Sequence, residues 1–160
     1  MKRLLSSLDA QFNALHARSN ALVGAVQAEM LYRQPRAPTP GTPPVYSGGE
    51  HILRSAACVE QTFGGLTANL WDDPFEWTLP ETLGTPALVA EYLAEVEATR
   101  RRGLALIETD ADLSKEIAVP SGEAQTLFAL LVETLTRAAH HQGRAFATFR
   151  LFSDERFPPL

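Results

Sequence analysis

Cysteine, long apolar runs and basic charge are all scarce in this chain of 160 residues. Its single cysteine, Cys58, excludes a framework of intrachain disulfides and is typical of a reducing compartment. No apolar run approaches the ~20 residues that span a bilayer, so we expect no association with a membrane. Polar residues interrupt the stretch after Met1-Lys2-Arg3, which argues against a signal peptide. We therefore predict a cytoplasmic protein.

The formal net charge is −5, because acidic residues outnumber basic ones. Nucleic-acid binding requires a concentrated basic surface, so this balance argues against that class of partner. The one basic run, Arg100-Arg101-Arg102, lies among glutamates and predicts a solvated helix face. The 45% hydrophobic content, in contrast, is sufficient for one globular domain with a real core.

Apolar residues recur at three-, four- and seven-residue steps in four segments, as they do on the buried face of a helix. The predicted helices span residues 4–32, 47–70, 85–110 and 120–151. Ser47 with Glu50 three residues later predicts a capping box at the start of the second helix. Thr85 followed by Pro86 predicts the start of the third helix. The run Pro120-Ser121-Gly122-Glu123 predicts the start of the fourth.

Two connectors are too long to be simple turns. Residues 34–44 contain five prolines, which fix φ and remove backbone donors, so we expect an extended segment able to cross the bundle. About 14 such residues reach about 45 Å. Residues 71–84 form the second connector. Its side chains Trp71, Phe75 and Trp77 are expected to plug the end of the core, and a lid over a pocket is the alternative.

We therefore predict an all-α protein, a four-helix bundle with long crossover connectors. The bundle is expected to span residues 1–152, and residues 153–160 form a C-terminal tail that either frays or docks on a partner. The aromatic tail and the ease with which bundles pair also raise the hypothesis of a homodimer. No β-alternation of useful length appears in the sequence.

Four local motifs resemble those of the DinB/YfiT-like superfamily in their order and spacing. They are Leu31-Tyr32-Arg33-Gln34-Pro35, Tyr46-Ser47-Gly48-Gly49-Glu50-His51-Ile52-Leu53, Asp110-Ala111-Asp112-Leu113 with the Pro-Ser-Gly-Glu run after it, and Ala138-Ala139-His140-His141-Gln142-Gly143-Arg144. The last motif resembles the family's His-x-x-His-His-x-Gly-x signature without its first histidine. The resemblance implies a four-helix bundle that holds a nickel or zinc ion through one histidine of the second helix and two of the fourth. Characterised relatives include thiol-dependent S-transferases and isomerases.

The metal-binding positions that the resemblance implies correspond here to Arg54, Arg137 and His141. An arginine stays protonated and has no lone pair to offer, so it cannot ligate a metal. Two guanidinium groups that face one site also repel a dication. We therefore expect no cofactor, and a divalent nickel or zinc ion is the alternative.

Other residues near these positions are poorly placed to form a metal site in place of the family's three histidines. His51, Glu133 and His141 form a conceivable mixed ligand set, since histidine and carboxylate ligation is common for transition metals. Glu133 and His141, however, are about 12 Å apart along a helix, and His140 points about 100° away from His141. Taken singly, His141 is more typical of a core or groove histidine bonded to a neighbouring helix, and His51 of a residue in the first turns of the second helix.

The two arginines have two interpretations. Glu50 precedes Arg54 by four residues and Glu133 precedes Arg137 by four, the favoured order for helical ion pairs. The preferred interpretation is that these two ion pairs replace the metal as polar cross-links. In the second interpretation, the former cation site receives an anion such as a carboxylate or phosphate.

We expect the pocket at the former metal site to be lined by Arg54, Cys58, Arg137 and His141. Cys58 lies four residues after Arg54, so a nearby guanidinium would activate its thiol, although a buried small residue is the more usual role. The predicted function is a DinB-like protein with a degenerate metal triad that binds a small molecule or anion there, or is noncatalytic. The alternative is a metal-dependent thiol S-transferase or hydrolase with an unorthodox ligand set around His141 and His51.

Overall fold

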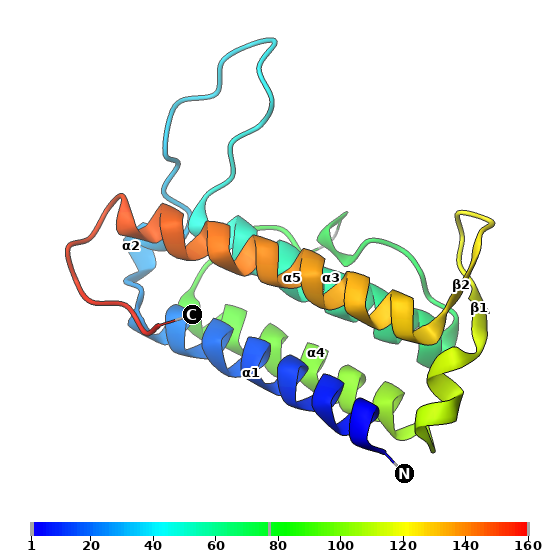
Figure 1. Ribbon diagram of the computed structural model, residues 1–160. Helices are drawn as coiled ribbons and strands as arrows, with labels where there is room; N and C mark the ends of the chain where they lie inside the picture. Colours follow the sequence, from blue (N-terminus) through cyan, green and yellow to red (C-terminus); the bar gives the residue numbers. More distant parts are fainter. Residues whose placement is uncertain (1, 77, 160) are drawn as a thin grey trace.

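Four long helices lie side by side in a computed structural model that describes residues 2–76 and 78–159 (Figure 1). These helices are α1 (Arg3–Ala25), α3 (Gly48–Ala68), α4 (Pro86–Ala105) and α5 (Leu127–Arg150). The shorter elements are α2 (Ala28–Leu31), the 3₁₀ turns η1 (Pro74–Glu76) and η2 (Asp110–Ser114), and the strands β1 (Glu116–Ala118) and β2 (Ala124–Thr126). The predicted all-α bundle is confirmed. No helix in the described part of the chain is long and apolar enough to cross a membrane.

Local capping sets the start of two helices, as predicted. The Ser47 hydroxyl accepts a hydrogen bond from the Glu50 backbone N–H at 3.2 Å, and the Glu50 carboxylate accepts one from the Ser47 N–H at 2.7 Å. This reciprocal capping box satisfies two donors that the first turn of α3 otherwise leaves unpaired. Thr85 caps α4 through the Leu88 N–H at 3.2 Å, with Pro86 at the first helical position.

The first predicted helix is too long. The backbone leaves the helical region at Val26 and Gln27, with ψ of 133° and 149°, and α2 follows as a separate turn. This break turns the chain so that Leu31 is fully buried and the Tyr32 hydroxyl donates to the Leu83 carbonyl at 2.6 Å. Burial and a long-range hydrogen bond therefore override the helical periodicity of this segment.

The predicted start of the fourth helix is also wrong, because residues 119–123 form the turn of a β-hairpin. The Gly122 N–H donates to the Val119 carbonyl at 2.9 Å, and Gly122 has φ of +82°, a conformation that suits glycine. Strand β1 pairs antiparallel with β2, and α5 begins only after Thr126, whose hydroxyl caps it. Strands of three residues are too short to produce a recognisable alternation.

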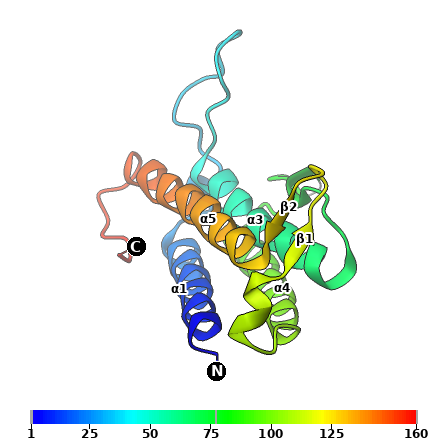
Figure 2. The same cartoon turned by 45° about the vertical axis from the view of Figure 1, so that its right-hand side comes forward.

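The helices do not alternate up and down. Helices α3 and α4 run parallel, because the connector between them returns along the length of the bundle (Figures 1 and 2). Backbone N–H groups of Leu4 and Leu5 donate to the Asp110 carboxylate, which places the start of α1 beside the segment that follows α4. The proline-rich connector 34–44 does not cross the bundle; it projects from one end as an exposed loop and returns to α3 (Figure 1).

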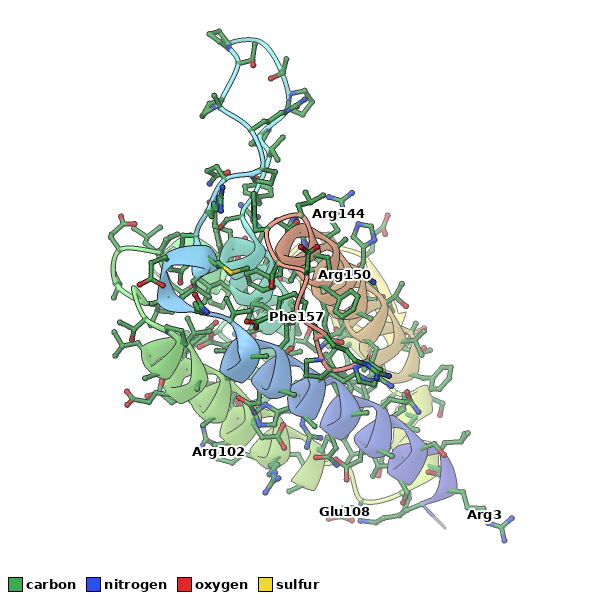
Figure 3. The ribbon with its side chains drawn as sticks, turned by 90° about the vertical axis from the view of Figure 1, so that its left-hand side faces the viewer. Arg3, Arg102, Glu108, Arg144, Arg150 and Phe157 are labelled. Atoms are coloured by element: carbon green, nitrogen blue, oxygen red, sulfur yellow. The ribbon has the colours of Figure 1, made fainter. Side chains whose placement is uncertain are left out.

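The C-terminal tail folds back on its own bundle rather than fraying. Phe157 is buried, and its ring centroid lies 6.3 Å from the rings of both Phe146 and Phe149 on α5. Figure 3 shows Phe157 lying against the helices. Phe157 thereby joins the hydrophobic core of the bundle.

One member of the basic run is buried, contrary to the prediction of a solvated face. Arg101 and Arg102 are exposed, but Arg100 is 1% exposed and bonds across the bundle. Its guanidinium donates to Glu97 through Nε and Nη2 at 2.7 Å, and also to Asp9 and Asn13 of α1. Helical periodicity places Arg100 on the inner face, and these four hydrogen bonds compensate its burial.

Candidate functional site

Helices α3 and α5 bring the four predicted pocket residues to one place. Arg54, Cys58, Arg137 and His141 line a cleft of about 40 Å³, which we name the arginine cleft. The two helices are held together beside it by hydrogen bonds, from the Ser55 hydroxyl to the Ala138 carbonyl at 2.8 Å and between the hydroxyls of Thr62 and Thr134 at 2.7 Å. A fifth candidate, His51, adjoins the cleft through His141.

The guanidinium of Arg54 lies between two aromatic rings. Its central carbon is 4.0 Å from the centroid of the Tyr46 ring and 3.8 Å from that of Phe75. Each such cation–π contact stabilises the charge by roughly 0.5–2 kcal/mol. The Nε atom of Arg54 is buried and has no hydrogen-bond partner among the described residues. Two aromatic rings thus pack against the guanidinium, while its Nε–H is left unpaired.

The predicted ion pair between Glu50 and Arg54 does not form. The Glu50 carboxylate accepts hydrogen bonds from the backbone and hydroxyl of Ser47 and from the Gln34 amide, so the capping box occupies it. Among the side chains that the structure describes, which do not include those of residues 76 and 77, Arg54 forms no ion pair within 4.0 Å. Glu133 and Arg137 do approach each other at 4.0 Å, with more than half of each side chain exposed. An exposed pair at this distance contributes little stability.

The imidazole rings of His51 and His141 face each other, with their Nδ1 atoms 3.3 Å apart. One ring donates to the other, so at least one proton lies between them. Burial lowers the pKa of His51 to about 4, and His141, Arg144 and Arg54 act in the same direction. Burial and then Arg54 also lower the pKa of His141. Both rings are therefore neutral at pH 7.

Cys58 is buried in the arginine cleft, and burial raises the pKa of its thiol. Arg137 and Arg54 oppose this shift without reversing it. The thiol is therefore protonated at neutral pH, which favours the interpretation of a small buried residue over that of a nucleophile.

The residues of the arginine cleft do not fit the divalent ion that the family resemblance implies. No group of three or more His, Cys, Asp or Glu is close enough to hold a metal within the described part of the chain. The rebuilt set of His51, Glu133 and His141 is not assembled, because Glu133 lines a different hollow. Two histidine donors remain, and two guanidinium groups beside them repel a cation.

A larger groove continues from the cleft toward the β-hairpin. It measures about 420 Å³ and lies between α3, α5, the hairpin and the start of the connector, and we name it the hairpin groove. Gln61 and Arg137 line both hollows, so the two adjoin. Sequence reasoning missed this groove because it did not detect the hairpin.

Two of the three connector aromatics, Trp71 and Phe75, are partly buried and pack against the core. Trp71 lines the hairpin groove and Phe75 covers Arg54, while Trp77 lies outside the described residues. The contacts of Tyr46 and Phe75 with Arg54 were not predicted. Tyr46 offers a local signal, since it directly precedes the helix cap and packs on His51 four residues into α3, a position typical of a hydrophobic staple.

The buried histidines predict a loss of stability in mild acid. Because the folded state lowers the pKa of His51 to about 4, below the ordinary value of about 6.5, the unfolded chain binds this proton first. Above pH 6.5, His51 is neutral in both the folded and the unfolded state, and its full contribution to the free energy of unfolding is present. It falls between pH 6.5 and about 4, by at most about 1.4 kcal/mol per pH unit for one proton.

Urea unfolding across this pH range measures the effect. We expect the His51→Gln variant to have a shallower pH dependence than the wild type. The exposed neighbour His140→Gln is the control for the substitution itself. A His51→Gln variant with the wild-type slope would show that this histidine does not control stability in acid.

Comparison with known proteins supports the architecture. No family model matches the chain, and no curated protein matches it by sequence. The structure is similar to that of a DinB-like protein from Bacillus cereus ATCC 10987, with a TM-score of 0.75 and 14% sequence identity. The likeness covers 97% of this chain and 96% of that one. An identity this low carries the arrangement of the helices and not the chemistry of a site, and by this likeness the chain has the DinB-like fold.

Proposed function

We propose that the chain binds a small organic anion in the arginine cleft, at the place where its DinB-like relatives are expected to hold a metal ion. One observation carries the proposal: Arg54 is held between two aromatic rings, with a buried Nε–H that has no partner in the described structure. A buried donor without a partner costs about 1–3 kcal/mol. A ligand oxygen at this position removes that cost.

The charges around the cleft favour an anion over a cation. Arg54 and Arg137 line it with one carboxylate, Asp73, which accepts a hydrogen bond from the Phe75 backbone N–H at 3.0 Å. Among the described side chains, Arg137 has one ion pair, an exposed contact with Glu133 at 4.0 Å. Arg144 lies close enough to lower the pKa of both histidines, and Figure 3 shows it on the side of the projecting loop. Guanidinium groups match the geometry of a carboxylate or phosphate through paired hydrogen bonds. The proposal assigns no catalytic step to the site.

Nuclear magnetic resonance of arginine side chains tests the proposal with acetate and inorganic phosphate as probes. We expect the Arg54 Nε–H resonance to shift and saturate in the wild type. Arg137→Gln should weaken the affinity by about tenfold or more, because a hydrogen bond to a charged group contributes about 1.5–3 kcal/mol. Arg36→Gln, an exposed arginine of the projecting loop, is the matched control. An Arg54 resonance that neither probe moves would contradict the proposal.

A metal-dependent thiol transferase or hydrolase is the alternative function, and one observation favours it. The 3.3 Å between the Nδ1 atoms of His51 and His141 equals the separation of two ligands on a tetrahedral ion with bonds of about 2.05 Å. Titration with zinc and with nickel separates the two functions. If the wild type binds one equivalent of metal and His141→Ala does not, the anion proposal is overturned. If the wild type binds neither metal, the metal-dependent alternative is overturned.

A further inference from the structure

We propose that the hairpin groove holds the body of the same ligand, and that this ligand is a monocarboxylate with a flat ring. The inference rests on the anion site proposed above, which would bind the carboxylate. A hollow of about 420 Å³ lies in the usual range of about 300–1,000 Å³ for small-molecule sites. The arginine cleft, at about 40 Å³, has room only for a small headgroup.

The two hollows follow the same pair of helices. Along α3, the lining residues run from Arg54 in the arginine cleft to Gln61, which lines both hollows. Along the antiparallel α5, they run from His141 in the arginine cleft to Leu130 in the hairpin groove. Seven residues of helix span about 10 Å and eleven span about 16 Å. Gln61 and Arg137 stand at the junction. A ligand that occupies both hollows is therefore elongated, with its anionic group at one end.

Trp71 lines the hairpin groove, and contacts with α3 and the start of the connector hold it in place. Its ring packs directly on α3 at Gly65, where a Cβ atom would lie 2.4 Å from the indole carbons. The indole Nε1–H donates to the Asn69 side chain at 2.9 Å, and the Trp71 carbonyl accepts from the Gln61 amide at 2.8 Å. An indole fixed in the wall of a groove is a surface on which the aromatic group of a ligand can stack.

Acidic side chains limit the charge of the ligand. Glu123 of the hairpin turn and Glu133 of α5 both line the hairpin groove, away from Arg54. A second negative charge on the ring would meet these carboxylates and be repelled. We therefore expect the hairpin groove to bind an uncharged ring. A monoanion fits the arginine cleft and the hairpin groove together better than a dianion does.

A set of matched probes tests the inference: acetate, 4-phenylbutanoate, 4-phenylbutan-1-ol and 4-(3-carboxypropyl)benzoate. We expect 4-phenylbutanoate to bind at least tenfold more tightly than each of the other three, which lack the ring, lack the charge, or carry a second carboxylate. Binding should also change the tryptophan fluorescence, and Trp71→Phe should abolish that change. Equal affinity for acetate and 4-phenylbutanoate would overturn the inference.

Two substitutions separate the inference from the proposed function. Ala124→Phe, on the exposed strand β2, fills the hairpin groove and should weaken 4-phenylbutanoate at least tenfold while leaving acetate unchanged. Ala10→Phe, exposed on α1 away from both hollows, is its control. Arg54→Gln should weaken both acids. If Ala124→Phe has no effect and Arg54→Gln does, the groove is wrongly assigned and the anion site stands. If Arg54→Gln affects neither acid, the proposed function fails.

Discussion

Replacement of Arg100 by methionine is expected to lower the free energy of unfolding by about 3 kcal/mol or more. The substitution leaves the Glu97 carboxylate, only 7% exposed, without its main partner, and removes the cross-link to Asp9 and Asn13 of α1. Breaking a buried charge pair from one side costs about 3–5 kcal/mol, since the remaining charge stays desolvated. Urea unfolding followed by circular dichroism measures the change.

Arg101 provides a matched control on the same carboxylate. It also donates to Glu97 at 2.7 Å, but 69% of its side chain is exposed. Arg101→Met should therefore cost at most about 1 kcal/mol. The double variant Arg100→Met with Glu97→Leu should recover much of the loss, because neither charge is then buried alone. Equal losses for Arg100→Met and Arg101→Met would contradict the assignment of Arg100 as a buried cross-link.

Replacement of Phe63 by alanine is expected to lower the free energy of unfolding by about 3–5 kcal/mol. Phe63 is fully buried at the centre of the bundle, where its ring meets Phe12 edge to face at a centroid distance of 5.3 Å. The ring also packs on α4 at Gly103, where a Cβ atom would lie 2.5 Å away. Truncation leaves a cavity that three helices border, so collapse of the surroundings is limited.

Thermal or urea unfolding compares Phe63→Ala with Phe128→Ala. Phe128 is also a helical phenylalanine, on α5, but it is 42% exposed. Its truncation should cost about 1 kcal/mol or less, because surface substitutions away from special features have small effects. Similar losses at the two positions would mean that the packing of α3 against α1 and α4 contributes little to stability.

Local chemistry explains which features of the fold were predictable. The Ser47–Glu50 capping box and the Thr85-Pro86 helix start depend on residues at most three positions apart, and both form as predicted. Capping geometry needs no information from the rest of the fold. The hairpin turn at Gly122 was missed because Pro-Ser-Gly-Glu also suits a helix start, and only its contacts distinguish the two.

The sequence predicted which residues lie together in the arginine cleft, but not which contacts they make there. Helical spacing places Arg54 with Cys58, and Arg137 with His141, on shared faces, and the structure brings both faces to one cleft. Helical spacing also predicts an Arg54–Glu50 ion pair, which is wrong because the capping box occupies Glu50.

The sequence by itself therefore determined the class of fold and the main helical segments. These follow from periodicity, capping and the chemistry of single residues. The tertiary structure alone decided that Arg54 lies between Tyr46 and Phe75, that Arg100 is buried, and that a groove follows the cleft. Such contacts join segments far apart in the chain, and their energies depend on burial, which no local pattern specifies.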